Sequence, residues 1–141
     1  MRWIPFAAVC AVFLASADFF VKLASSRISS SLGAMVYGLT TLGAGLAWVL
    51  YERATGQPQF STPAGWGYAF LVGLAFSGVT ILLYVTYTKV DVSIGSPTIR
   101  LSAVVLASLL GIAVLREPFT WRYLLGVVLA VAGVWLIVFR S

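Results

Sequence analysis

Histidine is absent from this 141-residue sequence, and cysteine occurs once, at Cys10. Without them the chain has no Ser-His-Asp arrangement, no intrachain disulfide and no histidine or cysteine metal site. A glycine-rich phosphate-binding loop is also missing. The sequence therefore predicts no enzymatic activity and neither a metal nor another cofactor, and it leaves the redox compartment open.

Charged residues are scarce, at 9% of the sequence against 61% apolar residues. Soluble domains usually carry about 25% charged residues, so this chain has too few polar groups to cover a surface that faces water. Nine basic and four acidic residues give a net charge of +5, but they lie near the ends of apolar runs and form no patch. We expect a lipid bilayer as the solvent and no nucleic acid partner.

The chain does have five long apolar runs, each near the ~20 residues that a membrane-spanning helix needs. The runs are apolar all round, without the alternation of a membrane barrel strand. The longest connection, residues 52–63, is too short for a separate domain. The sequence therefore predicts an all-α integral membrane bundle of five transmembrane helices in one domain, 1–141. The predicted spans are about 4–24, 32–51, 64–89, 93–115 and 121–139.

The first run has a second interpretation. Arg2, an apolar stretch over 6–14 and the small residues at 15–17 resemble a secretory signal with its cleavage site. The apolar stretch continues through Val21, however, which gives the length of a full span. We expect the segment to be retained as the first helix.

Several residues predict where helices begin. Pro5 and Pro63 suit first-turn positions, Thr62 and Thr120 can cap backbone amides, and three serines at 29–31 precede the second run.

Small residues recur at spacings that let helix backbones approach closely. Gly126 and Gly133 are seven residues apart and share one face of the last helix, which predicts that this face meets another helix. Pairs four residues apart predict tight packing of the second helix on the third: Ala34 and Gly38, Thr41 and Gly45, and Ala69 and Gly73.

Lysine and arginine are balanced across the predicted membrane, whereas an excess on one side normally sets orientation. The sequence therefore predicts insertion in both orientations and an antiparallel homodimer, which would rebuild an inverted-repeat transporter. The alternatives are one orientation set by weaker cues, or a separately encoded inverted partner. The starting side has Arg2, Arg53, Arg116 and Arg122, and the opposite side has Lys22, Arg27, Lys89 and Arg140.

Asp18 is an ionisable residue inside an apolar span, where a charge costs at least ~2.5 kcal/mol and usually faces a cavity or a partner. One interpretation is a carboxylate that binds a cation or exchanges a proton with the substrate. The other is a structural ion pair with Lys22, one turn away, or with Arg100. Asp18 and Arg100 both lie ~10 Å from the same membrane face, so they can meet.

Arg100 can also hold a carboxylate or phosphate in its planar fork. Pro97, one helical turn before Arg100, removes a backbone donor and loosens the helix locally. Tyr84 and Tyr87 offer rings and hydroxyls at a similar level, either for a substrate or as interfacial aromatics. The candidate substrate and proton site is thus Asp18, Arg100, Tyr84 and Tyr87.

The string KVDVSIGSPTIRLSAVVLASLLGIAVLREPFTWRYLLGVVLAVAGVWLIV resembles the closing helices of the EamA-type half of the drug/metabolite transporter superfamily. Its most telling part is LREPFTWRYLLG followed by AGV, with the acidic residue at Glu117 and the glycines at 126 and 133. The first run, ending in FFVKLAS, extends the likeness over essentially the whole chain. The resemblance implies a substrate cavity between the first four helices and a dimer that pairs through the last helix.

The last two helices also resemble those of the small multidrug resistance proteins, which pair antiparallel and use a first-helix carboxylate. The leading hypothesis is a proton-coupled exporter of a small metabolite or drug, in a prokaryotic plasma membrane, working with a second copy or an inverted homologous subunit. The alternatives are a flippase subunit for a phosphate-linked lipid, in which Arg100 holds the phosphate, and a non-transporting assembly or regulatory protein.

Overall fold

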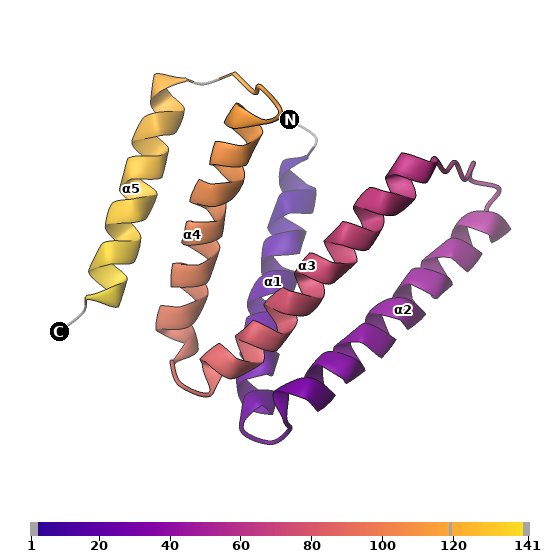
Figure 1. Cartoon of the computed structure of the whole chain (residues 1–141), viewed down its shortest axis with the longest axis horizontal. Helices are drawn as coiled ribbons and strands as arrows, with labels where there is room; N and C mark the ends of the chain where they lie inside the picture. Colours follow the sequence, from indigo (N-terminus) through magenta and orange to yellow (C-terminus); the bar gives the residue numbers. More distant parts are fainter. Residues whose placement is uncertain (1–2, 119, 140–141) are drawn as a thin grey trace. The chain divides into compact units, whose positions relative to one another are not determined.

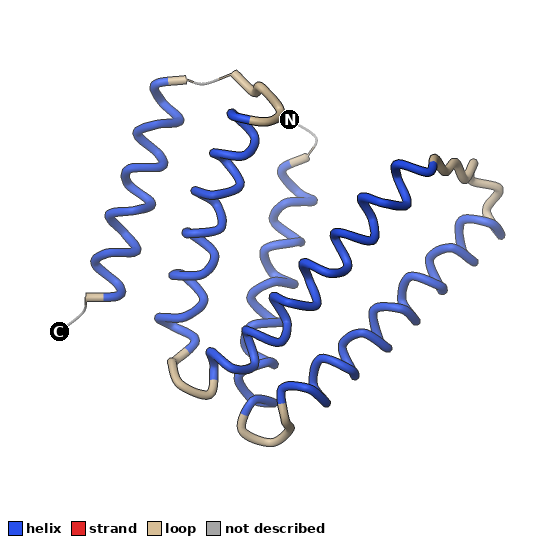
Figure 2. Tube along the Cα trace, in the orientation of Figure 1, coloured by secondary structure: helices blue, strands red, loops and turns tan. Residues whose placement is uncertain are grey.

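Five α-helices make up most of the computed structural model, which describes residues 3–118 and 120–139 (Figures 1 and 2). Those residues form no strand, and each helix is long and apolar enough to cross a membrane. The predicted all-α fold of five spanning helices is confirmed. The largest difference between a predicted and an observed helix end is at the end of α2, predicted at residue 51 and observed at Ala54. The helices are α1 (Ile4–Ser25), α2 (Ser30–Ala54), α3 (Pro63–Tyr87), α4 (Val92–Ala113) and α5 (Trp121–Val138).

Hydroxyl side chains begin three of the helices. Ser29, Thr62 and Thr120 each accept a hydrogen bond from the backbone N–H three residues later, at 3.5, 3.1 and 3.3 Å. Such bonds satisfy amides that have no partner inside the helix. Pro63 occupies the first turn of α3, where its missing N–H costs nothing. The predicted caps at Thr62 and Thr120 are confirmed.

Helix α2 ends in a turn that requires a left-handed residue. Gly56 has φ of 68° and donates its N–H to the carbonyl of Arg53 at 3.2 Å, while Gln57 donates to Glu52 at 2.9 Å. These two hydrogen bonds satisfy carbonyl groups in the last turn of the helix. Glycine adopts the left-handed conformation that they need without a steric penalty.

The chain forms two compact units, Met1–Asp18 with Val90–Ser141, and Phe19–Lys89. Helix α1 begins in the first unit and ends in the second. In the first unit α4 packs along α5, and in the second α2 packs along α3 (Figure 1). That the chain is a single domain stays a prediction.

Most apolar side chains of the described residues point outward. Phe6 and Phe13 are 74% and 72% exposed, for example, which would be unfavourable in water. In a bilayer the lipid tails are as apolar as these side chains, so little hydrophobic force drives them inward. Six described residues are buried: Asp18, Gly33, Thr80, Tyr87, Gly95 and Gly111.

The close contact between α2 and α3 lies near the start of α2. A Cβ placed on Gly33 would come within 2.5 to 2.9 Å of the ring of Tyr84. A Cβ on Gly38, Gly45 or Gly73 would meet nothing within 4 Å. Packing of α2 on α3 was therefore predicted correctly, but the glycines chosen for it were wrong, because their faces do not meet the neighbouring helix.

Gly33→Ala should destabilise the protein by about 1–3 kcal/mol, since the added methyl group overlaps a packed ring. Gly38→Ala, in the same helix, should be neutral or stabilising by up to about 1 kcal/mol, because alanine favours helix and the space is open. Unfolding of the purified variants in detergent measures both. In a Tyr84→Ala background the penalty of Gly33→Ala should vanish, and a penalty that persists there would contradict this contact.

Candidate functional site

One face of α1 carries a stripe of small and apolar residues that ends in a carboxylate. Ala11, Leu14, Ala15 and Asp18 are spaced i, i+3, i+4 and i+7, which places them on one side of the helix. Only 1% of Asp18 is exposed. Since an unpaired buried carboxylate is costly, Asp18 needs close partners.

A matching stripe runs along α4. Ser96, Arg100, Ala103 and Ala107 are spaced i, i+4, i+7 and i+11, so they also share a face. Pro97 lies inside α4, yet the helix continues without interruption from Val92 to Ala113. The polar residues therefore keep helical spacing despite the missing backbone donor.

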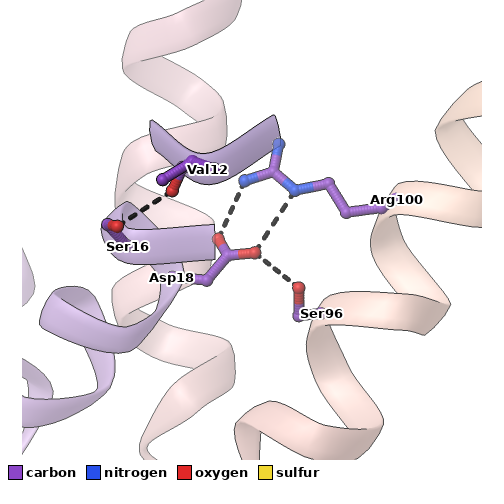
Figure 3. A network of polar contacts seen from close by, with 5 residues as sticks. All are labelled: Val12, Ser16, Asp18, Ser96 and Arg100. Atoms are coloured by element: carbon purple, nitrogen blue, oxygen red, sulfur yellow. Dashed lines mark hydrogen bonds and ion pairs between the residues drawn. The ribbon is translucent and has the colours of Figure 1, made fainter. Parts of the chain in front are cut away.

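The two stripes meet at their polar ends (Figure 3). Arg100 donates from Nη2 to Oδ1 of Asp18 at 2.8 Å and from Nε to Oδ2 at 3.3 Å. Ser96 donates from Oγ to Oδ2 at 2.5 Å. The two-pronged contact of guanidinium and carboxylate is among the stronger side-chain interactions. The predicted meeting of Asp18 and Arg100 is confirmed, and Ser96 is a further partner that was not predicted from the sequence.

The two charged groups differ in accessibility. The side chain of Arg100 is 33% exposed, whereas that of Asp18 is 1% exposed. A guanidinium has five N–H donors, and within the described residues Arg100 directs two of them to Asp18. Figure 3 shows its third nitrogen pointing away from the carboxylate. A molecule approaching this site meets the arginine before the aspartate.

A groove of about 510 Å³ lies along the two stripes. Its polar lining is the cluster of Asp18, Ser96 and Arg100, which we call the charged cluster. The groove is large enough for a small organic molecule. The rest of its lining is apolar: Ala11, Leu14, Ala15, Ala103, Val104 and Ala107.

Comparison with known proteins identifies the family of this chain. The EamA-like transporter family matches residues 1–139. The chain belongs to the EamA-like transporter family. No curated protein and no solved structure matches it. Family membership, together with five helices of spanning length, makes the chain a multi-pass integral membrane protein and indicates a transporter of small molecules.

Glu117, the acidic residue of the string LREPFTWRYLLG, lies at the turn between α4 and α5. The N–H of Glu117 donates to the carbonyl of Gly111 at 3.2 Å, and a Cβ on Gly111 would lie 2.6 Å from a Glu117 carboxylate oxygen. Arg116, just before it, has φ of 55°. Glu117 thus lies against the last turn of α4 and helps to close this turn.

The other predicted site residues lie in the unit Phe19–Lys89. The ring of Tyr84 covers Gly33, and Tyr87 is 1% exposed. Lys22 donates from Nζ to the Tyr87 carbonyl at 2.8 Å. A role of the two tyrosines in substrate binding stays a prediction for this EamA-like chain.

The predicted dimer face of α5 is open in this EamA-like protein. A Cβ on Gly126 or Gly133 would meet no atom within 4 Å. Of the residues in the charge balance, Arg2 and Arg140 lie outside the described residues. The likeness of α4 and α5 to small multidrug resistance proteins is not shown by the family match and stays a prediction.

Proposed function

We propose that this EamA-like chain is a proton-coupled exporter of a small metabolite or drug, with the charged cluster as its substrate and proton site. The observation that carries the proposal is a carboxylate, 1% exposed, that is paired with an arginine beside a groove of about 510 Å³. Ionisable groups at such depth in membrane proteins commonly mark substrate or proton pathways.

Coupling follows from the contacts of Asp18. As a carboxylate, Asp18 holds Arg100 by two hydrogen bonds and accepts a third from Ser96. A proton on Asp18 removes the negative charge and weakens its hold on the guanidinium. Proton binding to Asp18 therefore frees Arg100 to bind a substrate in the groove. The affinity for a substrate group that contacts Arg100 then depends on whether Asp18 is protonated.

The proposal includes a second copy in the opposite orientation. The described lysines and arginines, apart from Arg100, divide equally between the two predicted sides of the membrane. The outward apolar faces of the helices, including the open face at Gly126 and Gly133, leave room for a partner. An inverted pair would supply two related halves around one pathway, in what we propose is a prokaryotic plasma membrane.

The decisive experiment is substrate-dependent proton movement in proteoliposomes, tested with cationic, neutral and anionic compounds. Asp18→Asn should abolish the coupling of proton flux to substrate, because asparagine takes up no proton. Ser16→Ala should keep the coupling, since the Ser16 hydroxyl bonds the backbone carbonyl of Val12 and lies outside the charged cluster. Coupling that survives in Asp18→Asn would remove Asp18 from the mechanism, and failure of the wild type to move any compound would favour a non-transporting assembly protein.

A second candidate is a flippase subunit for a phosphate-linked lipid. The observation that favours it is the apolar lining of the groove beside Arg100. Transfer of a fluorescent phospholipid between leaflets of the proteoliposomes, without proton movement, would support this candidate over the exporter.

A further inference from the structure

The charged cluster offers donors to a ligand. Arg100 supplies two of its five N–H groups to Asp18, and its side chain is one-third exposed. Both Asp18 oxygens already accept hydrogen bonds, from Arg100 and from Ser96, and the residue is 1% exposed. The accessible part of the cluster is therefore the unused edge of a guanidinium, which matches a carboxylate or phosphate and repels a cation.

The groove continues away from the charged cluster along an apolar wall. Ala11 lies seven residues before Asp18 on α1, and Ala107 lies seven residues after Arg100 on α4, which corresponds to about 10 Å along each helix. Ala15 and Ala103 lie between them and also line the groove. Four alanines leave space where larger side chains would fill it, and none of them offers a hydrogen bond.

We infer that the groove binds an amphipathic organic anion, with a carboxylate or phosphate group on Arg100 and an apolar chain or ring along the four alanines. This inference rests on the proposed function, because it takes the groove as the substrate site. The groove has one polar end and one apolar wall. The anionic group of the ligand can therefore hydrogen-bond to Arg100 while its apolar chain packs against the alanines. Desolvation of an unpaired group would otherwise oppose binding.

Calorimetric titration of the purified full-length protein tests this ligand class. We expect octanoate and octyl phosphate to bind, and octyltrimethylammonium, acetate and inorganic phosphate to bind at least about tenfold more weakly, as loss of a charged hydrogen bond or of apolar burial implies. Octanoate against octyl phosphate distinguishes a carboxylate head from a phosphate head. Tighter binding of the cation, or equal binding of acetate and octanoate, would overturn the inference.

Two variants separate the polar end from the apolar wall. Asp18→Asn with Arg100→Gln removes the guanidinium without leaving a buried carboxylate unpaired, and it should weaken octyl anions on the order of tenfold or more. Ala15→Leu narrows the wall and should weaken octanoate, whereas the control Ala17→Leu, on an exposed position of α1 outside the groove lining, should not. Unchanged affinity in Ala15→Leu would overturn the placement of the chain.

The binding titrations test the ligand class and the transport assay tests the exporter, so either proposal can be contradicted without the other. Octyl anions that bind through Arg100 but drive no proton movement would uphold the inference and contradict the exporter. Proton-coupled transport of cations, with no binding of octyl anions, would uphold the exporter and overturn the inference.

Discussion

Replacing Arg100 by alanine should lower the free energy of unfolding by about 3–5 kcal/mol, because it leaves the Asp18 carboxylate buried without its charged partner. Asp18→Ala should cost less. It leaves a guanidinium that is one-third exposed and can reach polar surroundings. The asymmetry follows from burial, since the two substitutions remove the same ion pair.

Unfolding of the variants in mixed detergent, followed by circular dichroism, measures these differences. The double variant, Asp18→Ala with Arg100→Ala, should be less destabilised than the sum of the two single variants, since no charge is then left buried and unpaired. The Ser96→Ala variant is the matched control and should cost about 1.5–3 kcal/mol, as expected for one hydrogen bond to a charged group. A larger cost for Asp18→Ala than for Arg100→Ala would contradict the burial argument.

Fixing the orientation of the chain should nearly abolish transport if the active form is an antiparallel homodimer. Added lysines on one side of the membrane bias insertion strongly when the native balance is even. Gln57→Lys with Ser61→Lys adds charge to the loop before α3, and Ser26→Lys with Thr88→Lys adds it on the opposite predicted side. All four positions are exposed. Each double variant should insert one way and be inactive alone.

Coexpression of the two double variants should restore transport, since it supplies both orientations. Labelling of added terminal cysteines from either side of the membrane, with Cys10 replaced by serine, confirms the orientation of each. Gln57→Lys with Ser26→Lys adds one lysine on each predicted side, so it keeps the charge balance and serves as the control for loop damage. Full activity of either variant by itself, in one fixed orientation, would rule out the antiparallel homodimer.

The helices could be predicted from the sequence because a bilayer restricts the choice of structure. A span needs about 20 apolar residues with every backbone group paired inside it, so hydropathy alone locates α1 to α5. Thr62 and Thr120 were identifiable as caps because a hydroxyl before a helix satisfies local amides, which needs no knowledge of the tertiary structure.

The charged cluster was only partly predictable. Asp18 and Arg100 could be paired by counting helical rise from the same membrane face, since depth depends on position in the span. Ser96 was missed, although it lies one turn before Arg100 on the same face of α4. A serine inside a membrane helix often bonds its own backbone, as Ser16 does with Val12 at 2.8 Å (Figure 3), so residue type alone does not reveal a partner.

Helix packing was harder to predict because spacing identifies a face and says nothing about its neighbour. Gly38 and Gly45 have the small size of packing residues, but a Cβ added to either would meet nothing of a neighbouring helix within 4 Å. Gly33, near the start of α2, makes the close contact because the ring of Tyr84 on α3 reaches that level. The pairing of faces depends on crossing position, which the repeat of small residues does not encode.

The chain passes between its two compact units at two places, after Asp18 and after Lys89. The second lies in the short turn between α3 and α4, but the first lies inside the uninterrupted helix α1. A helix resists stretching because its hydrogen bonds fix the rise at about 1.5 Å per residue. An axial movement of either end of α1 would therefore carry with it the helical turn that holds Asp18.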